Sequence, residues 1–289
     1  MTRDLSRQTA LRPITGKSTR KPLAPWACAL AIGGLDPGGG AGIAADLRAF
    51  SAAGAFGCAA LAVLTVQSTA GLRSARAIPS RDVLAQVIEV MRSQRVGSVK
   101  VGALGDRRNV RAVADLLAKY PRVPVVVDTP MTPTRGTGRL LAAGALSSER
   151  DDLVPRATLL TANLDEVFAL TGERVRTIGE AHDAARALSA LGARAVLVKG
   201  GHLSGPEAID VLAVDGEVIE LRARRLSIPA THGTGCTFAS LVAGRLAIRR
   251  TPDVGREVLV AAVRWAKRRH HAALERTADV GRGLRVVVF

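Results

Sequence analysis

Short apolar runs and longer amphipathic segments alternate along the chain. The apolar runs predict buried strands, and apolar residues recurring every three or four positions predict helices. The predicted strands cover residues 27–34, 58–66, 98–102, 124–127, 158–161 and 195–198. The predicted helices cover residues 41–53, 82–94, 107–120, 165–171, 180–191, 237–248 and 254–274. Strands that alternate with helices indicate βαβ units and an α/β fold with a mostly parallel sheet.

One pair of predicted strands departs from this alternation. Residues 211–214 and 218–221 flank Asp215 and Gly216, a dipeptide that is a strong hairpin signal. We therefore expect an antiparallel edge at this point of the sheet. Because no repeat or composition shift marks a boundary, we predict a flexible basic tail over residues 1–25 and a single domain over residues 26–289.

The formal net charge of +16 raises the question of a nucleic-acid partner. The basic residues are spread along the chain, and aromatic residues make up only 3%, which leaves few side chains on which bases could stack. We expect no nucleic-acid partner.

Cysteine content and hydropathy bear on the compartment. Cys28, Cys58 and Cys236 stand far apart, so neither a disulfide framework nor a zinc site is indicated, and a reducing cytoplasm is expected. No uncharged apolar run reaches the roughly 18 residues that a membrane span needs. We expect no membrane partner.

The first motif with chemical meaning is a glycine-rich stretch, residues 33–42, that follows the first predicted strand and leads into a helix. Glycines let the backbone approach a ligand, and a helix start presents free N–H groups. The stretch is neither the dinucleotide fingerprint in its usual context nor a P-loop. A tight turn without a ligand is the alternative.

A second motif, residues 231–237, opens an apolar helix with the sequence Thr-His-Gly-Thr-Gly-Cys-Thr. Backbone N–H groups at a helix start suit the charge of a transferring phosphoryl group. Cys236 would lie in the same positive field, which we expect to lower its pKa and make it a base toward a substrate hydroxyl. The alternative is a structural cysteine after a helix cap.

Oxygen and amine groups follow three of the predicted strands. Asn163 and Glu166 share the first turn of a helix and Asp128 ends another strand, an arrangement that suits Mg²⁺, although a capping box explains the first two equally well. Lys199 follows a strand and could reach nucleotide phosphates, or it is a solvated lysine at a strand end.

In order and spacing these motifs resemble the hydroxymethylpyrimidine and phosphomethylpyrimidine kinases of the ribokinase-like superfamily. The resemblance covers about residues 28–275 and depends on the two loops over residues 33–47 and 232–237. It implies a three-layer α/β/α ribokinase-like domain with a mostly parallel central sheet. It also implies ATP and Mg²⁺ as cofactors, a small pyrimidine as substrate, a homodimer, and a role in thiamine diphosphate biosynthesis or salvage.

The resemblance assigns roles to residues of this chain. Cys236 is the expected base, and the phosphate cradle comprises Gly233, Thr234 and Gly235. The pyrimidine pocket is expected to contain Gly34, Asp36, Ala41, Asp46, Gln67, Ala103 and Pro130. ATP and Mg²⁺ are expected near Asp128, Asn163, Glu166, Lys199 and Thr231, with Mg²⁺ organised by Asp128, Asn163 and Glu166.

One side chain supports the substrate class by its own chemistry. The amide of Gln67 offers one donor and one acceptor, which complement a ring nitrogen and an exocyclic amine of an aminopyrimidine. Ala44 and Ala103 replace a glutamine and a methionine that are usual in the family, and these changes would widen the pocket. A pyridoxal kinase, a kinase of the monophosphate only, and a non-catalytic pyrimidine-binding paralogue remain as alternatives.

Overall fold

The computed structural model describes residues 26–128, 130, 135, 140, 142, 144–249, 251 and 253–289. The predicted tail over residues 1–25 lies outside these described residues. In the described part of the chain, no helix is long and apolar enough to cross a lipid bilayer.

Nine strands form one sheet in the order β3-β2-β1-β4-β5-β6-β7-β8-β9. They are β1 (Cys28–Leu35), β2 (Phe56–Ser68), β3 (Gly71–Ala77), β4 (Val96–Val101), β5 (Val125–Asp128), β6 (Leu159–Ala162), β7 (Ala195–Val198), β8 (Glu207–Val214) and β9 (Glu217–Arg224). Strands β2, β1, β4, β5, β6 and β7 run parallel to one another, whereas the β2–β3, β7–β8 and β8–β9 pairs are antiparallel. A short second sheet pairs β10 (Thr231–His232) with β11 (Arg285–Val286).

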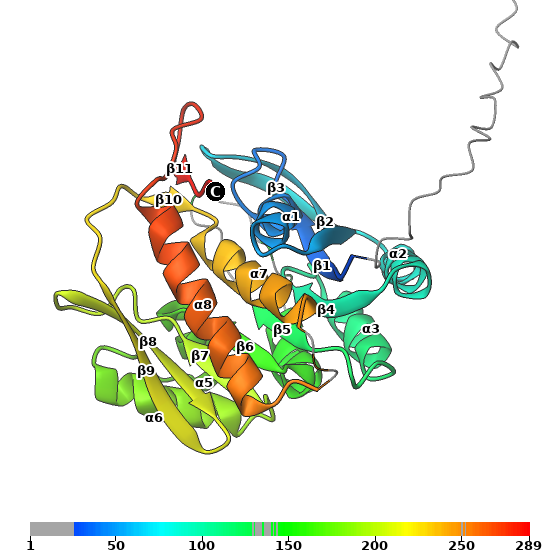
Figure 1. The fold of residues 1–289 in the computed structure, drawn as a ribbon. Coiled ribbons are helices and arrows are strands. Elements are labelled where there is room, and N and C mark those ends of the chain that lie inside the picture. The colour runs from blue at the N-terminus through cyan, green and yellow to red at the C-terminus, as the bar shows by residue number, and fades with distance from the viewer. Residues whose placement is uncertain are drawn as a thin grey trace, which may run out of the picture.

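Helices cover both faces of the large sheet (Figure 1). One face packs against α1 (Gly42–Ala52), α7 (Thr234–Ala247) and α8 (Arg256–Leu274). The other packs against α2 (Ser80–Ser93), α3 (Arg107–Leu117), α5 (Leu164–Thr171) and α6 (Ile178–Ser189). The remaining turns are α4 (Ala145–Ser148), a π-helix η1 (Glu149–Leu153) and a 3₁₀ helix η2 (Val154–Arg156).

Alternation along the strands explains why both faces are covered. On β1, Cys28, Leu30 and Ile32 belong to one apolar cluster, whereas Ala29 and Ala31 belong to the other. All five side chains are buried, so this central strand has no polar face. A near-continuous apolar run is therefore what a strand in the middle of three layers requires.

The predicted three-layer α/β fold with a mostly parallel sheet is confirmed, and so is the antiparallel hairpin. At its turn Asp215 and Gly216 have φ of +50° and +79°, the left-handed conformation that such a two-residue turn needs. The structure also differs from the prediction. No strand was predicted at β3, whose only large apolar residue is Leu72, and α7 begins at Thr234 rather than at residue 237.

Candidate active site

Every residue that the sequence analysis assigned to the site lines one cavity of about 420 Å³. This cavity lies where the parallel strands β1, β4, β5, β6 and β7 end, the edge at which open α/β sheets bind ligands. The cavity thus brings together the two glycine loops, which are almost 200 residues apart in the chain. We call it the acceptor cavity below.

Asp36 shapes the first glycine loop. Its buried carboxylate accepts hydrogen bonds from the backbone N–H groups of Gly38 and Ala41, at 2.8 and 2.9 Å. Burial by itself would raise the pKa of Asp36, but His232 and these two N–H groups outweigh it and hold the pKa below its usual value. The loop therefore folds around an ionised carboxylate.

His232 connects this loop to the second one, and the sequence analysis did not assign it to the site. Its Nε2 atom lies 2.9 Å from Asp36 Oδ2 and 3.2 Å from the amide nitrogen of Gln67. His232 is buried, at 5% exposed. The amide of Gln67, our expected reader of the substrate ring, thus lies beside a histidine that a carboxylate orients.

The second loop leads into α7, whose N-terminal residue has no side-chain cap. Gly233 occupies this position with φ of +74°, and the first backbone N–H groups of the helix are those of Thr234, Gly235 and Cys236. N–H groups in the first turn of a helix have no partner within that helix and can hold an anion. All three residues line the acceptor cavity.

Our expectation of a lowered pKa for Cys236 is wrong for this structure. Burial raises the pKa of the Cys236 thiol to about 11, and the nearby carboxylates of Asp128 and Asp46 add to this effect. Lys100 and a backbone hydrogen bond from Gly42 oppose it. The helix terminus supplies a positive field, but removing the thiol from water has the larger effect.

Lys100 is a second residue that the sequence analysis did not assign to the site. It lines the acceptor cavity from the end of β4, and its Nζ lies 3.1 Å from both oxygens of Asp46. Asp46 also accepts a hydrogen bond of 2.7 Å from Ser240. Both oxygens of Asp46 are therefore already paired, and its predicted contact with substrate stays a prediction.

Lys199 occupies the centre of the predicted ATP and Mg²⁺ region. Its Nζ lies 3.0 Å from Asp128 Oδ1 and 3.6 Å from Glu166 Oε2, and the side chain is only 17% exposed. The alternative of a solvated lysine is thus wrong. Asn163 and Glu166 form the capping box of α5, so the structural explanation for this pair holds whatever else the two residues do.

Lys199, Asp128 and Glu166 form a cluster whose charges would accommodate a further cation. Burial and the neighbouring Asp128 raise the pKa of Glu166 to about 7, even though Lys199 opposes the shift. One ammonium group therefore does not fully balance two buried carboxylates, and hard oxygen ligands are those that Mg²⁺ prefers. In the described part of the chain there is no group of three or more His, Cys, Asp or Glu residues that could hold a metal. A site here would depend on two carboxylates and water.

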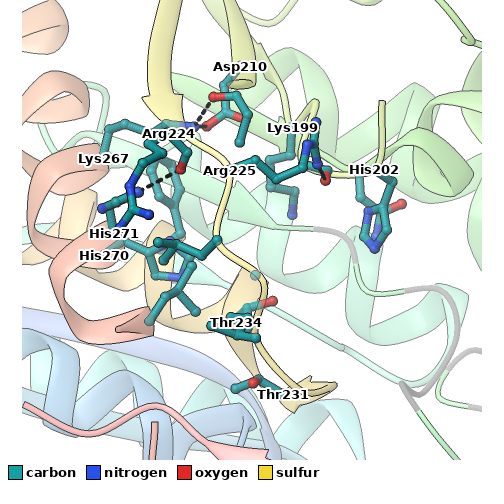
Figure 2. A pocket seen from close by; sticks show the side chains of 18 of the residues that line it. Lys199, His202, Asp210, Arg224, Arg225, Thr231, Thr234, Lys267, His270 and His271 are labelled. Atoms are coloured by element: carbon teal, nitrogen blue, oxygen red, sulfur yellow. Dashed lines mark hydrogen bonds and ion pairs between the residues drawn. The ribbon is translucent and has the colours of Figure 1, made fainter. Parts of the chain in front are cut away.

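A second cavity of about 420 Å³ adjoins the first, and we call it the donor cavity. The two share Asn163, Lys199, His202, Thr231, Thr234 and Gly235. Figure 2 shows Lys199 and His202 on one side of the donor cavity, and Lys267, His270 and His271 of α8 on the other. Lys267 is bonded to Asp210 at 2.7 Å, and Phe238 contacts the ring of His270 edge-on.

Comparison with known proteins agrees with this geometry. Residues 36–288 match the family model described as phosphomethylpyrimidine kinase. The chain belongs to this family. It is 42% identical over 255 residues to the hydroxymethylpyrimidine/phosphomethylpyrimidine kinase of Streptomyces coelicolor. The matched region covers 88% of this chain and 91% of the relative. A thiamine biosynthesis bifunctional protein of Geobacter sulfurreducens is 38% identical over 90% of this chain and 51% of its own length. The predicted family and phosphotransferase class are confirmed.

Solved structures lead to the same fold. The chain resembles Bacillus subtilis pyridoxal kinase, solved as an ADP complex, with a TM-score of 0.80, 28% identity, and coverage of 91% of this chain and 97% of that one. It also resembles a phosphomethylpyrimidine kinase of Clostridium difficile, with a TM-score of 0.71, 28% identity, and coverage of 85% and 98%. Pyridoxal kinases and phosphomethylpyrimidine kinases therefore share this arrangement.

Proposed function

We propose that this kinase transfers the γ-phosphoryl group of ATP to the hydroxymethyl group of 4-amino-5-hydroxymethyl-2-methylpyrimidine, to its monophosphate, or to both, in the cytoplasm. The product would serve thiamine diphosphate biosynthesis or salvage. The observation that carries the proposal is the pair of adjoining cavities that share Thr234 and Gly235 at the start of α7. A donor on one side and an acceptor on the other would meet at that helix terminus.

The donor cavity suits a nucleoside triphosphate. Lys199 and Lys267 supply positive charge, and Phe238 with the apolar residues Leu226 and Ile228 supplies surface for a base. The similar Bacillus subtilis enzyme was solved with ADP, which supports a nucleotide donor for this chain. Asp128 and Glu166 would hold Mg²⁺, with Asn163 nearby. When bound, the ion would supply positive charge to the phosphates.

The acceptor cavity suits a small heterocycle. Gln67 would pair with the ring, and the N–H groups of Gly235 and Cys236 would stabilise the charge on the transferring group. The substrate hydroxyl oxygen attacks the γ-phosphorus and gives its proton to the thiolate form of Cys236, while the bond from the γ-phosphorus to the β–γ bridging oxygen breaks and ADP leaves.

Two assays test this proposal. Purified protein with ATP and Mg²⁺ is given hydroxymethylpyrimidine, its monophosphate or pyridoxal, and the products are identified by mass spectrometry. We expect turnover of at least one pyrimidine. Turnover of pyridoxal alone would favour the second candidate, pyridoxal kinase, which the similarity to the Bacillus subtilis enzyme supports. Turnover of none of the three would contradict the proposal.

The second assay addresses Cys236 directly. Cys236→Ala should lose turnover but bind ATP as the unaltered chain does, because the thiol lines only the acceptor cavity. Cys28→Ala is the matched control, since Cys28 is buried at the start of β1, the end of that strand that lies away from the acceptor cavity. If Cys236→Ala turns over pyrimidine as fast as the unaltered chain, Cys236 is not the base.

A homodimer belongs to the same proposal. Phe56, Leu64 and Val66 of β2 are exposed, and a second copy of the chain would cover such apolar side chains. Light scattering after size-exclusion chromatography would give the mass. A monomer at micromolar concentration would contradict this part of the proposal.

A further inference from the structure

Lys100 and Asp46 form the most deeply buried ion pair in the described part of the chain. Their side chains are 1% and 0% exposed. Burying two charges costs several kcal/mol, and the attraction between them often does no more than offset that cost. A purely structural role could be filled by apolar residues, so the position of the pair is the feature to explain.

Two helices, α1 and α7, place this pair about one helical turn from Cys236. Asp46 lies one turn after Gly42 on α1, and Ser240 lies one turn after Cys236 on α7. Residues four apart share a helix face, so the 2.7 Å hydrogen bond from Ser240 to Asp46 aligns the two faces. Gly42 and Cys236 lie one turn earlier on the same two helix faces, and the backbone of Gly42 is among the groups that favour the thiolate.

Charged groups from each strand and helix around Cys236 act on its thiol. Burial by itself lowers the pKa of Lys100, but Asp46 reverses this effect and keeps the ammonium charged. Lys100 on β4 is the largest influence that favours the thiolate, whereas Asp128 on β5 and Asp46 on α1 oppose it. Lys199, after β7, also interacts with Cys236, but it is paired with Asp128.

We propose that Lys100 and Asp46 together set the proton affinity of Cys236, with the ammonium favouring the thiolate and the carboxylate limiting that effect. Lys100 is thus a positioning residue that acts through Cys236. The hydrogen bond from Ser240 on α7 fixes the position of Asp46 on α1, and with it the position of the ion pair. This inference rests on the proposed role of Cys236 as the base. It assigns a function to Lys100, the buried lysine of β4.

Alkylation of Cys236 by iodoacetamide tests the inference without substrate or ATP. Only the thiolate reacts, so the rate at a given pH reports the proton affinity of the sulfur. Mass spectrometry of the peptide that contains Cys236 separates it from the buried Cys28 and Cys58. The rate is measured on the full chain between about pH 7 and pH 10, since each change of one pKa unit alters the thiolate fraction about tenfold.

The two partners of the ion pair should have opposite effects. Lys100→Met should slow alkylation about tenfold or more, and Lys100→Arg should restore it. Asp46→Asn should accelerate alkylation, because it removes a negative charge near the thiol while Asp128 still favours the charged form of Lys100. Lys267→Met is the matched control, since Lys267 forms a similar pair with Asp210 away from the acceptor cavity and should leave the rate unchanged.

A purely structural role would give a different result. If Lys100 and Asp46 only hold α1 and β4 together, both variants should loosen the site and change the rate in the same direction. Equal directions, or unchanged rates in both variants, would overturn the inference. Asp46→Asn keeps the test valid if Lys100→Met does not fold. Because the assay contains no substrate, its failure is distinct from a failure of the proposed kinase activity.

Discussion

Nε2 of His232 lies 2.9 Å from Oδ2 of Asp36, and this contact joins two loops that are 196 residues apart. One loop follows the first strand of the sheet, and the other opens α7. The contact makes a single wall of the acceptor cavity from two ends of the chain. The substrate and phosphate regions of the site therefore depend on one buried carboxylate.

We expect Asp36→Asn to weaken both stability and substrate binding. The amide cannot accept all the hydrogen bonds of the carboxylate, and the loss should lower the free energy of unfolding by about 1–3 kcal/mol. Because the pKa of Asp36 is lowered on folding, its contribution is present above the ordinary aspartate pKa and is lost as the pH falls through the folded value.

Thermal unfolding between about pH 3 and pH 7 checks this prediction, together with KM for the pyrimidine. Asp183→Asn is the control, because Asp183 is 77% exposed and should change neither quantity. An Asp36→Asn chain that unfolds like the unaltered chain at neutral pH would contradict the role given to this carboxylate.

Gly233 makes the closest backbone approach between the same two loops. A Cβ atom at this position would lie 1.9 Å from the carbonyl oxygen of Gly40, and φ is +74°. Gly233→Ala should therefore force the loops apart and reduce turnover more than tenfold. Gly205→Ala isolates the cost of backbone strain, since φ is +115° there but no atom lies within 4 Å. Turnover and thermal unfolding of both variants decide whether the clash matters.

The sequence predicted the fold well because its information is local. The alternation of strands and helices follows from apolar runs on strands such as β1, and the hairpin follows from the preferences of Asp215 and Gly216. Strand β3 was not predicted because two arginines interrupt its apolar pattern. Its extended conformation depends on pairing with β2 rather than on its own sequence.

The site was predictable only as far as its residues stand in recognisable loops. Lys100 lies in a strand whose other residues are uncharged, and nothing near it in the sequence shows that Asp46 would pair with it. The raised pKa of Cys236 could not be predicted from the sequence either, because burial by distant segments outweighs the local field of the helix terminus. Charges that come together through tertiary contacts have no signal in a single segment of sequence.

Glu149 should make stability depend on pH. It is fully buried in η1, and among the described residues neither carboxylate oxygen has a hydrogen-bond partner. Burial, with a further effect of Glu166, raises the pKa of Glu149 to about 8. Since the folded chain holds this proton more tightly than the unfolded chain, stability should fall as the pH rises from about 4.5 to about 8.

We expect Glu149→Gln to flatten this profile. At pH 7 the buried carboxyl costs about 3 kcal/mol relative to the unfolded chain, and the neutral amide avoids the part that is due to charge. Urea unfolding at several pH values between 5 and 8 measures the difference. Asp152→Asn is a matched control from the same π-helix, because that carboxylate is 36% exposed and bonded to Arg111. Parallel profiles for Glu149→Gln and the unaltered chain would contradict the prediction.

Lys199 should compete with Mg²⁺ for the carboxylates of Asp128 and Glu166. Its ammonium lies 3.0 and 3.6 Å from them, and they are 3% and 8% exposed. Lys199→Met would leave two buried carboxylates without their cation, which should lower the free energy of unfolding by about 3–5 kcal/mol. Added Mg²⁺ should then raise the melting temperature of the variant more than that of the unaltered chain, because a divalent cation can replace the missing charge.

The control for this experiment is Lys267→Met. Lys267 is paired with Asp210 at 2.7 Å with similar burial, and among the described residues Asp210 is its one carboxylate partner. This variant should lose stability without gaining a response to Mg²⁺. If Mg²⁺ stabilises both variants equally, the ion acts elsewhere on the chain. If Lys199→Met is as stable as the unaltered chain, the pair of carboxylates must take up protons instead, and the raised pKa of Glu166 indicates which group would take the first one.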